Sequence, residues 1–188
     1  AETLVVAMAL KSTVFKAELQ VSDLDRHYYA SHALTLARHP SETDERMMVR
    51  LLAFALYADE RLEFGRGLSA EDEPALWRKD LTGAIELWIE VGLPDERMLR
   101  RACGKADRVA VLCYGGRGAD LWWEQNREKL ERLRNLEVLG LPAEATQALA
   151  ALASRNMGLQ CTIQEGQIWI GSGERTAHIE PVVLHRLG

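Results

Sequence analysis

The feature that most constrains the fold is a strand, helix and strand pattern in the middle of the chain. In residues 85–91 apolar side chains occupy every odd position, which is the period of a strand with one covered face. Pro94 and two acidic residues after it predict a helix to about residue 106, and an apolar run follows at 108–114. A helix between two strands predicts that the strands pair in parallel, because a parallel connection needs a long crossover. The expected fold class is therefore α/β (α+β).

Hairpins and further helices surround this unit. Residues 11–21 alternate between polar and apolar, and after a polar turn residues 28–37 are expected to return as an antiparallel partner. Residues 75–79 and 85–91 form a second predicted hairpin, in which pairing residue 80 with 85 places residue 75 beside Glu90. The other predicted strands are 61–67, 136–139, 159–164, 167–171 and 178–184, and the other helices are one that begins at Ser41 and those at 119–133 and 142–153.

We expect these elements to form a single domain over residues 1–188, with one mixed β-sheet and flanking helices. Residues 1–7 could be a leader or an extension of the first strand. The 23 basic and 28 acidic residues give a net charge of -5, which excludes the overall basicity of a nucleic-acid coating protein. Apolar stretches fall well short of the roughly 20 residues of a membrane span, and no signal-peptide pattern is present. The sequence thus predicts a cytoplasmic protein without a membrane partner.

The cysteines and histidines give no sign of a disulfide framework or a zinc site. Cys103, Cys113 and Cys161 are odd in number and lack CxxC spacing, so we expect reduced and mostly buried thiols. The five histidines are scattered, and no HExxH pair occurs among them.

Acidic residues give the strongest chemical signal. Glu45 shares a helical stripe with Met48 and Leu52, so its carboxylate is either a first-turn acid favoured by the helix dipole or an acid that points toward a site. Glu90 lies on the central strand, and the predicted hairpin brings Glu73 close to it. Two or three converging carboxylates are what Mg²⁺ requires, whereas the alternative is that these acids are solvated at the sheet edge.

These residues belong to long motifs by which the chain resembles the YaeQ family from Met8 onward. The resemblance implies a compact α/β domain built round a variant of the PD-(D/E)xK restriction-endonuclease core, in proteins without an established biochemical role. The motifs are Met8-Ala9-Leu10-Lys11, the run from Leu34 to Met48, Asp72-Glu73-Pro74, the run from Leu87 to Glu96, and Trp122-Trp123-Glu124-Gln125-Asn126.

The resemblance maps the nuclease motif onto this chain with two departures. Glu45 falls at the acid of the first helix, Pro74-Ala75 at the PD, and Glu90-Val91-Gly92 at the (D/E)xK. Ala75 therefore replaces the metal-binding aspartate, and Gly92 replaces the lysine that positions the attacking water. Substitutes for the missing side chains would be Glu73 or Asp72 and Lys105 or Lys79.

Two functional hypotheses follow. In the first, the protein is a Mg²⁺-dependent, nuclease-like hydrolase with Glu45, Glu73 and Glu90 as metal ligands and Lys105 beside the water. In the second, it is a binding protein without robust catalysis, whose partner is a nucleic acid or a protein. Because Ala75 supplies no metal ligand and Gly92 no cation, the second hypothesis is favoured.

Three further features bear on partners. Arg97, Arg101 and Lys105 follow one helical stripe, which would contact phosphates or be a solvated face. Trp122 is expected in the core, whereas Trp123 is a candidate for an exposed patch or partner contact. Residues 115–118 contain three glycines without a nucleotide-binding pattern, and are interpreted as a turn.

Overall fold

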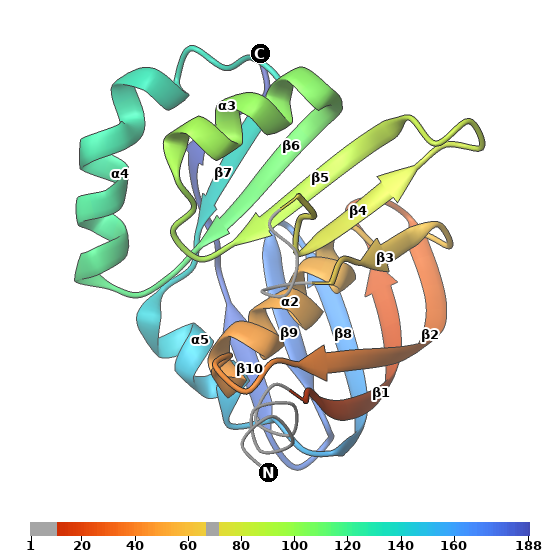
Figure 1. The fold of residues 1–188 in the computed structure, drawn as a ribbon. Coiled ribbons are helices and arrows are strands. Elements are labelled where there is room, and N and C mark those ends of the chain that lie inside the picture. Colours follow the sequence, from red (N-terminus) through yellow and green to blue (C-terminus); the bar gives the residue numbers. More distant parts are fainter. Residues whose placement is uncertain (1–10, 67–71) are drawn as a thin grey trace, which may run out of the picture.

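The structure is a computed structural model that describes residues 11–66 and 72–188 (Figure 1). The predicted leader or extension at residues 1–7 lies outside the described residues. The strands form two mixed sheets, with four helices in the described part of the chain.

The first sheet has the strand order β10 (Thr176–Ile179), β9 (Gln167–Gly171), β8 (Asn156–Gln164), β1 (Thr13–Asp23) and β2 (Tyr28–Arg38). The second has the order β11 (Val182–His185), β7 (Leu136–Gly140), β6 (Ala106–Cys113), β5 (Ile85–Val91), β4 (Leu76–Lys79) and β3 (Leu62–Phe64). The helices are α2 (Asp44–Leu56), α3 (Glu96–Lys105), α4 (Arg117–Leu130) and α5 (Ala143–Ala150).

The prediction of a single mixed sheet is wrong. The N-terminal hairpin pairs with β8 in parallel, with Lys16 beside Asn156, and does not join the central strands. Period-2 alternation identifies a strand and its covered face, but it does not say which other strand lies beside it. A pairing between segments about 140 residues apart therefore could not be read from the pattern.

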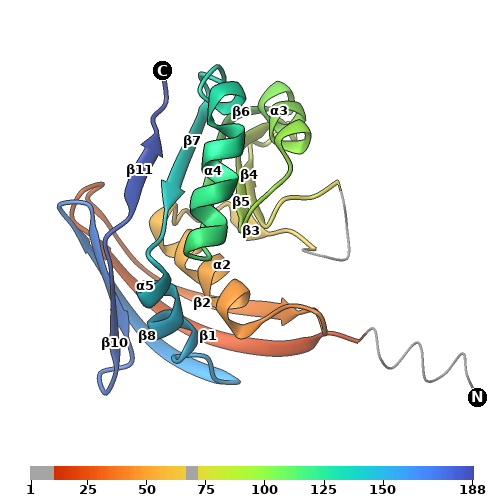
Figure 2. The same cartoon turned by 90° about the vertical axis from the view of Figure 1, so that its left-hand side faces the viewer.

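Helix α2 lies between the two sheets (Figure 2). Every residue from Met47 to Ala55 is buried, and these side chains share one apolar core with β1, β8 and β5. A helix that is covered on all sides is a core helix, whereas its sequence showed only one apolar stripe. Helices α3 and α4 cover the outer face of the second sheet over a separate apolar cluster (Figure 2).

The central unit is as predicted. Strands β5 and β6 pair in parallel, and β7 continues the parallel arrangement. The predicted register of the 75–91 hairpin is also confirmed, because Leu76 lies opposite Ile89 and Arg78 opposite Leu87, before a bulge at Lys79.

Two predicted elements differ in their limits. The strand predicted at residues 178–184 is divided at Pro181 into β10 and β11, which belong to different sheets, since proline cannot donate to a ladder. Helix α2 begins at Asp44 and not at Ser41, because the hydroxyl of Thr43 caps it by accepting from the Arg46 N–H at 3.1 Å.

Trp122 lies in the core as predicted, and Trp123, the candidate for an exposed patch or partner contact, is also buried, with 8% accessible. Both rings belong to the cluster under α4, whereas Leu121 is the exposed apolar residue of this helix. The three cysteines are free thiols, two of them buried and Cys103 half-buried, as expected. None of the helices among the described residues is long and apolar enough to cross a membrane.

Candidate functional site

The first turn of α2 meets the carboxyl ends of the parallel strands β5 and β6. Tyr114 directly follows β6, and the pKa of its hydroxyl is raised first by burial and then by the charge of Glu45 on α2. Glu90 is the penultimate residue of β5, at the same end of the sheet. Since ligands of open α/β sheets bind at the carboxyl ends of the strands, this edge is the candidate functional site.

Glu90 is a buried carboxyl group at this edge, with 8% of the residue exposed. Burial raises its pKa to about 7, although the hydrogen bond from Trp88 and the charge of Arg46 act in the opposite direction. The indole Nε1 of Trp88 donates to Oε1 of Glu90 at 3.0 Å. Trp88 belongs to the cluster under α3 and α4, whereas Ile89 and Val91 face α2. Glu90 therefore exchanges its proton near neutral pH.

A second buried acid, Glu42, precedes α2 and is held by two arginines. Arg50, which is 2% exposed, donates from Nε at 2.9 Å and from Nη2 at 2.6 Å to the two carboxylate oxygens. Arg46 also binds Glu42. Nη2 of Arg50 donates a further hydrogen bond to the carbonyl of Ala37 at 3.2 Å. Arg46 therefore binds Glu42, and its charge also lowers the pKa of Glu90. In this way it connects the start of α2 to the site.

Glu45 is directed toward α5. Its Oε2 accepts from the hydroxyl of Thr146 at 3.1 Å. The residue of α2 whose charge acts on Glu90 is Arg46, which follows Glu45 in the sequence. Glu45 therefore binds a residue of α5, while α2 packs against the face of β5 that carries Ile89 and Val91.

Glu73 binds Arg66. One of its oxygens accepts from the Arg66 N–H at 2.8 Å and the other from Nε at 3.2 Å, and these bonds lower its pKa. Asp72 is exposed. Ala75 directly precedes β4, whose first residue Leu76 lies opposite Ile89, and its side chain has no oxygen to offer a metal.

These placements do not fit a magnesium ion held by Glu45, Glu73 and Glu90. Within residues 11–66 and 72–188, no three His, Cys, Asp or Glu side chains are close enough to share a metal ion. Each of the three acids instead has another partner: Thr146, Arg66 and Trp88, respectively.

Both candidate lysines, Lys79 and Lys105, lie far from Glu90. Lys79 pairs with Ile85 on the ladder, and Lys105 directly precedes the β6 residue that also pairs with Ile85. Both therefore lie at the other end of β5 from Glu90, about 16 Å away along the strand. Helix α3 starts beyond Gly92 and returns along the sheet, which carries Lys105 away from the site. Gly92 itself has a φ of +96°, a conformation that strains a lysine.

The basic stripe of α3 is a solvent-facing surface. Arg97, Arg101 and Lys105 are exposed, and no side-chain ion pair involves them in the described structure. Arg100 lies beside them, 3.8 Å from Glu96. Helix α3 therefore offers cations to an anionic partner.

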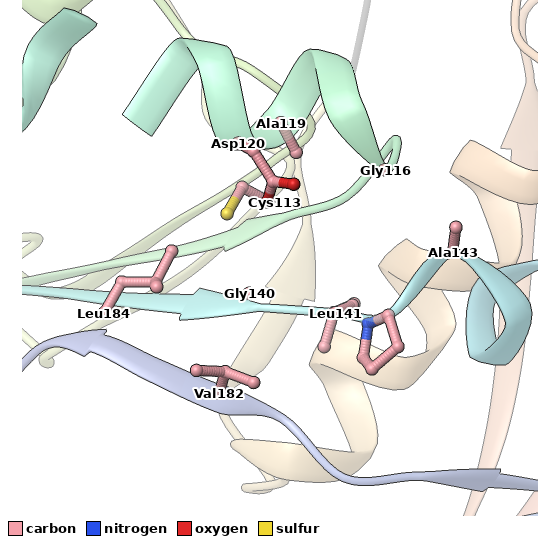
Figure 3. Close-up of a pocket in the computed structure, with 10 residues that line it drawn as sticks. Cys113, Gly116, Ala119, Asp120, Gly140, Leu141, Ala143, Val182 and Leu184 are labelled. Carbon is pink, nitrogen blue, oxygen red and sulfur yellow. The ribbon is translucent and has the colours of Figure 1, made fainter. Parts of the chain in front are cut away.

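A cavity of about 270 Å³ opens next to the site, at the ends of β6 and β7 (Figure 3). Its walls come from the first turns of α4 and α5 and from β11, and they are mostly apolar. The labelled side chains include Leu141, Val182 and Leu184, and Asp120 is the charged residue among them (Figure 3).

Sequence reasoning missed the Glu42, Arg46 and Arg50 network. The three residues are spaced four apart, which places them on one helical stripe, so the spacing was a usable signal. The burial of Glu42 and Arg50 was not predictable, because it depends on segments outside the helix: Arg50 donates to the carbonyl of Ala37 on β2 and lies over the ring of Phe64 on β3.

The fold and the site together define a class: a two-sheet α+β protein with a core helix whose first turn meets a buried acid at the ends of parallel strands. A family model described as "YaeQ protein" matches residues 8–181. The chain belongs to the YaeQ family.

Relatives of known sequence and structure agree with this assignment. "Uncharacterized protein YaeQ" of Salmonella typhi is 51% identical over 173 residues, which cover 92% of this chain and 96% of the relative. The protein of the same name from Escherichia coli (strain K12) is 50% identical over 172 residues, or 92% and 95% of the two chains.

Two crystal structures are similar to this one throughout. The YaeQ protein from Xanthomonas axonopodis pv. citri superposes with a TM-score of 0.90 at 52% identity, covering 93% of this chain and 98% of that one. The YaeQ protein from Pseudomonas syringae has a TM-score of 0.88 at 39% identity, with coverage of 92% and 96%.

Proposed function

We propose that this protein is a binding protein that has kept a restriction-endonuclease-like core without robust metal-dependent catalysis. The supporting observation is the separation of Glu45, Glu73 and Glu90, each of which is bound to a partner outside any common coordination sphere. Cleavage of a phosphodiester needs both charge stabilisation and water activation, and the chain lacks the standard aspartate and lysine for these roles.

The competing function is a Mg²⁺-dependent nuclease-like phosphodiester hydrolase. It is favoured by the pKa of Glu90, which burial raises to about 7, so that this carboxyl group can exchange a proton near neutral pH. In that function Glu45, Glu73 and Glu90 would have to move together to hold Mg²⁺, with Lys105 or Lys79 replacing the missing cation.

Magnesium titration combined with cleavage assays decides between these functions. We expect no saturable Mg²⁺ binding by calorimetry in the millimolar range, and no cleavage of single- or double-stranded DNA or RNA. Cleavage that depends on Mg²⁺ and is lost in Glu90→Gln, but not in the exposed matched variant Glu124→Gln, would establish the nuclease and refute the binding-only proposal.

Nucleic acid is one candidate partner, because α3 presents exposed cations. Fluorescence anisotropy with labelled duplex DNA and RNA at several salt concentrations tests this contact. If three phosphates contact Arg97, Arg101 and Lys105, changing all three to Gln lowers the salt-dependence slope by about 2 to 3. The control changes Arg127 of α4 and Arg132, which follows this helix, to Gln; both already pair with glutamates. An unchanged slope in the α3 variant would exclude this surface.

A further inference from the structure

The outer edge of β2 is a long strand edge without the usual protection. β2 ends the first sheet and pairs with β1 along all 11 residues without a bulge. Residues 28–37 contain no Asp, Glu, Lys, Arg or Pro. Free edges in natural proteins normally carry a charge, a proline or a bulge that blocks further pairing.

The hydrogen bonds of β1 show which backbone groups of β2 point outward. The Lys16 N–H binds a carbonyl on the β8 side, so even-numbered residues of β1 face β8 and odd-numbered ones face β2. In the ladder, odd-numbered residues of β1 lie opposite even-numbered residues of β2. The N–H and C=O groups of the odd-numbered residues of β2 therefore point away from β1; these residues are Tyr29, Ser31, Ala33 and Thr35. These outward groups have no hydrogen-bond partner in the described structure.

The same side of the molecule carries a cavity of about 540 Å³, between the start of β2 and the turn after α2. One wall is aromatic, since the rings of Tyr28 and His32 stack at a centroid distance of 6.0 Å and their OH and Nε2 atoms are 2.8 Å apart. Tyr29, 61% exposed, and Ser31 of the free edge also line the cavity. The edge and the cavity therefore form one continuous surface.

The charge of this cavity is negative. Asp59 and Glu60 line it. Asp59 lies 4.0 Å from Nε of Arg61, whereas the side chain of Glu60 has neither a hydrogen bond nor an ion pair in the described structure. Arg61, the lining cation, is already bound by Glu86 and by the carbonyl of Lys79. The nearby Arg26 lies over the Tyr28 ring and is bound by Asp23.

An aromatic wall with an unpaired carboxylate is a binding site for an organic cation, and a free strand edge is a binding site for an extended backbone. We infer that the edge of β2 binds an extended segment of a partner protein, with a lysine or arginine side chain of that segment in the cavity beside Tyr28 and Glu60. This inference rests on the proposed binding function and names its partner class. Peptide binding and nucleic-acid cleavage are measured separately, so a failure to bind peptides would not change the result of the cleavage assay.

The test uses labelled, blocked ten-residue peptides of alternating Thr and Gln, in which one Lys is placed at each position in turn. Fluorescence anisotropy should detect binding when the Lys register matches the cavity. We expect the same peptide with Gln in place of Lys to bind roughly three- to tenfold more weakly. A version with N-methyl groups on alternate amides should not bind, because it cannot add to the edge.

Variants of the protein assign the contact. Glu60→Gln should weaken binding of the Lys peptide by the same factor as the loss of its lysine, whereas the matched variant Glu63→Gln on β3 should not. Ala33→Pro removes an outward N–H and should abolish binding without breaking a β1 bond. If Ala33→Pro fails to fold, the N-methylated peptide tests the same contact.

Three outcomes would overturn the inference. The first is that none of the Lys peptides binds. The second is binding that survives both Glu60→Gln and Ala33→Pro. The third is a dimer in solution, seen by light scattering and lost in Ala33→Pro, which would assign the edge to a second copy of this chain.

Discussion

At the scale of single residues, Glu90 couples the stability of the fold to pH. Its folded pKa of about 7 lies above the value of 4.5 in an unfolded chain, so the folded protein binds the proton more tightly. The free energy of unfolding is therefore highest at low pH with respect to this group, and falls as pH rises from about 4.5 through 7. Between pH 5 and pH 8, Glu90 should lower the free energy of unfolding of the unmodified protein by roughly 2 to 3 kcal/mol. Glu90→Gln should remove this loss, because glutamine does not titrate.

Urea unfolding of both proteins at pH 5 and pH 8 checks this prediction, with Glu124→Gln as the exposed control. The control should change the free energy of unfolding equally at the two pH values. A Glu90→Gln protein that shows the same pH dependence as the unmodified protein would mean that Glu90 is solvated and titrates normally.

The buried ion pair of Glu42 and Arg50 gives a second residue-scale prediction. Glu42→Ala leaves the guanidinium of Arg50 buried without its counter-charge, so it should cost about 3 to 5 kcal/mol in unfolding free energy. The double change Glu42→Leu with Arg50→Met should recover much of this loss, because no buried charge then lacks a partner.

Chemical denaturation measures both effects, and the exposed pair of Arg127 and Glu131 supplies the control. Glu131→Ala should cost no more than about 1 kcal/mol, as is usual for surface pairs. If Glu42→Ala were equally mild, the network would be accessible to water and would contribute little.

The positions of the candidate site residues could be predicted only in part. The alternation of residues 85–91 correctly gives the strand of Glu90, and the predicted hairpin register is correct from Leu76 to Arg78. Which group each acid binds depends on distant chain segments, as in the contact between Glu45 and Thr146, 101 residues later. Local patterns carry no information about such contacts.

At the scale of elements, Gly65 fixes the approach of β3 to the segment before β4. Its N–H donates to the carbonyl of Ala75 at 3.0 Å, and a Cβ at this position would lie 2.0 Å from the carbonyl oxygen of Pro74. Backbone atoms cannot move aside cheaply, so Gly65→Ala should destabilise the protein by about 1 to 3 kcal/mol.

Gly104 of α3 is the matched control, because a Cβ there would meet nothing within 4 Å. Gly104→Ala should stabilise the protein by up to about 1 kcal/mol through helix propensity. Thermal unfolding of the two variants checks the pair of predictions, and a neutral Gly65→Ala would show that the two segments separate without cost.

Secondary structure was more predictable than sheet membership. The first hairpin, the parallel β5–β6 pair and the three outer helices follow from periodicity and from Pro and Gly positions. The segment after residue 176 shows the limit, since β10 and β11 look like one apolar strand but join different sheets on the two sides of Pro181. The sheet that each half joins is determined by the strand it pairs with, β9 for β10 and β7 for β11, and not by its own sequence.

At the scale of the whole molecule, two connections hold the sheets together. α2 packs between them, and the chain passes from β10 of the first sheet to β11 of the second within two residues. Neither sheet can therefore lose its structure without exposing one face of the α2 core. This coupling predicts a single cooperative unfolding transition, as in other small proteins with one shared core.

Tryptophans report on both sheets, because Trp169 lies on β9 and Trp88 on β5. In protein labelled with 5-fluorotryptophan, the ¹⁹F signals of these two residues should disappear at the same urea concentration, each assigned by its Trp→Phe variant. Leu51→Ala, in the middle of α2, should cost about 2 to 5 kcal/mol and move both midpoints equally. If the Trp169 signal changed at a separate midpoint, the first sheet would unfold independently and α2 would not couple the two sheets.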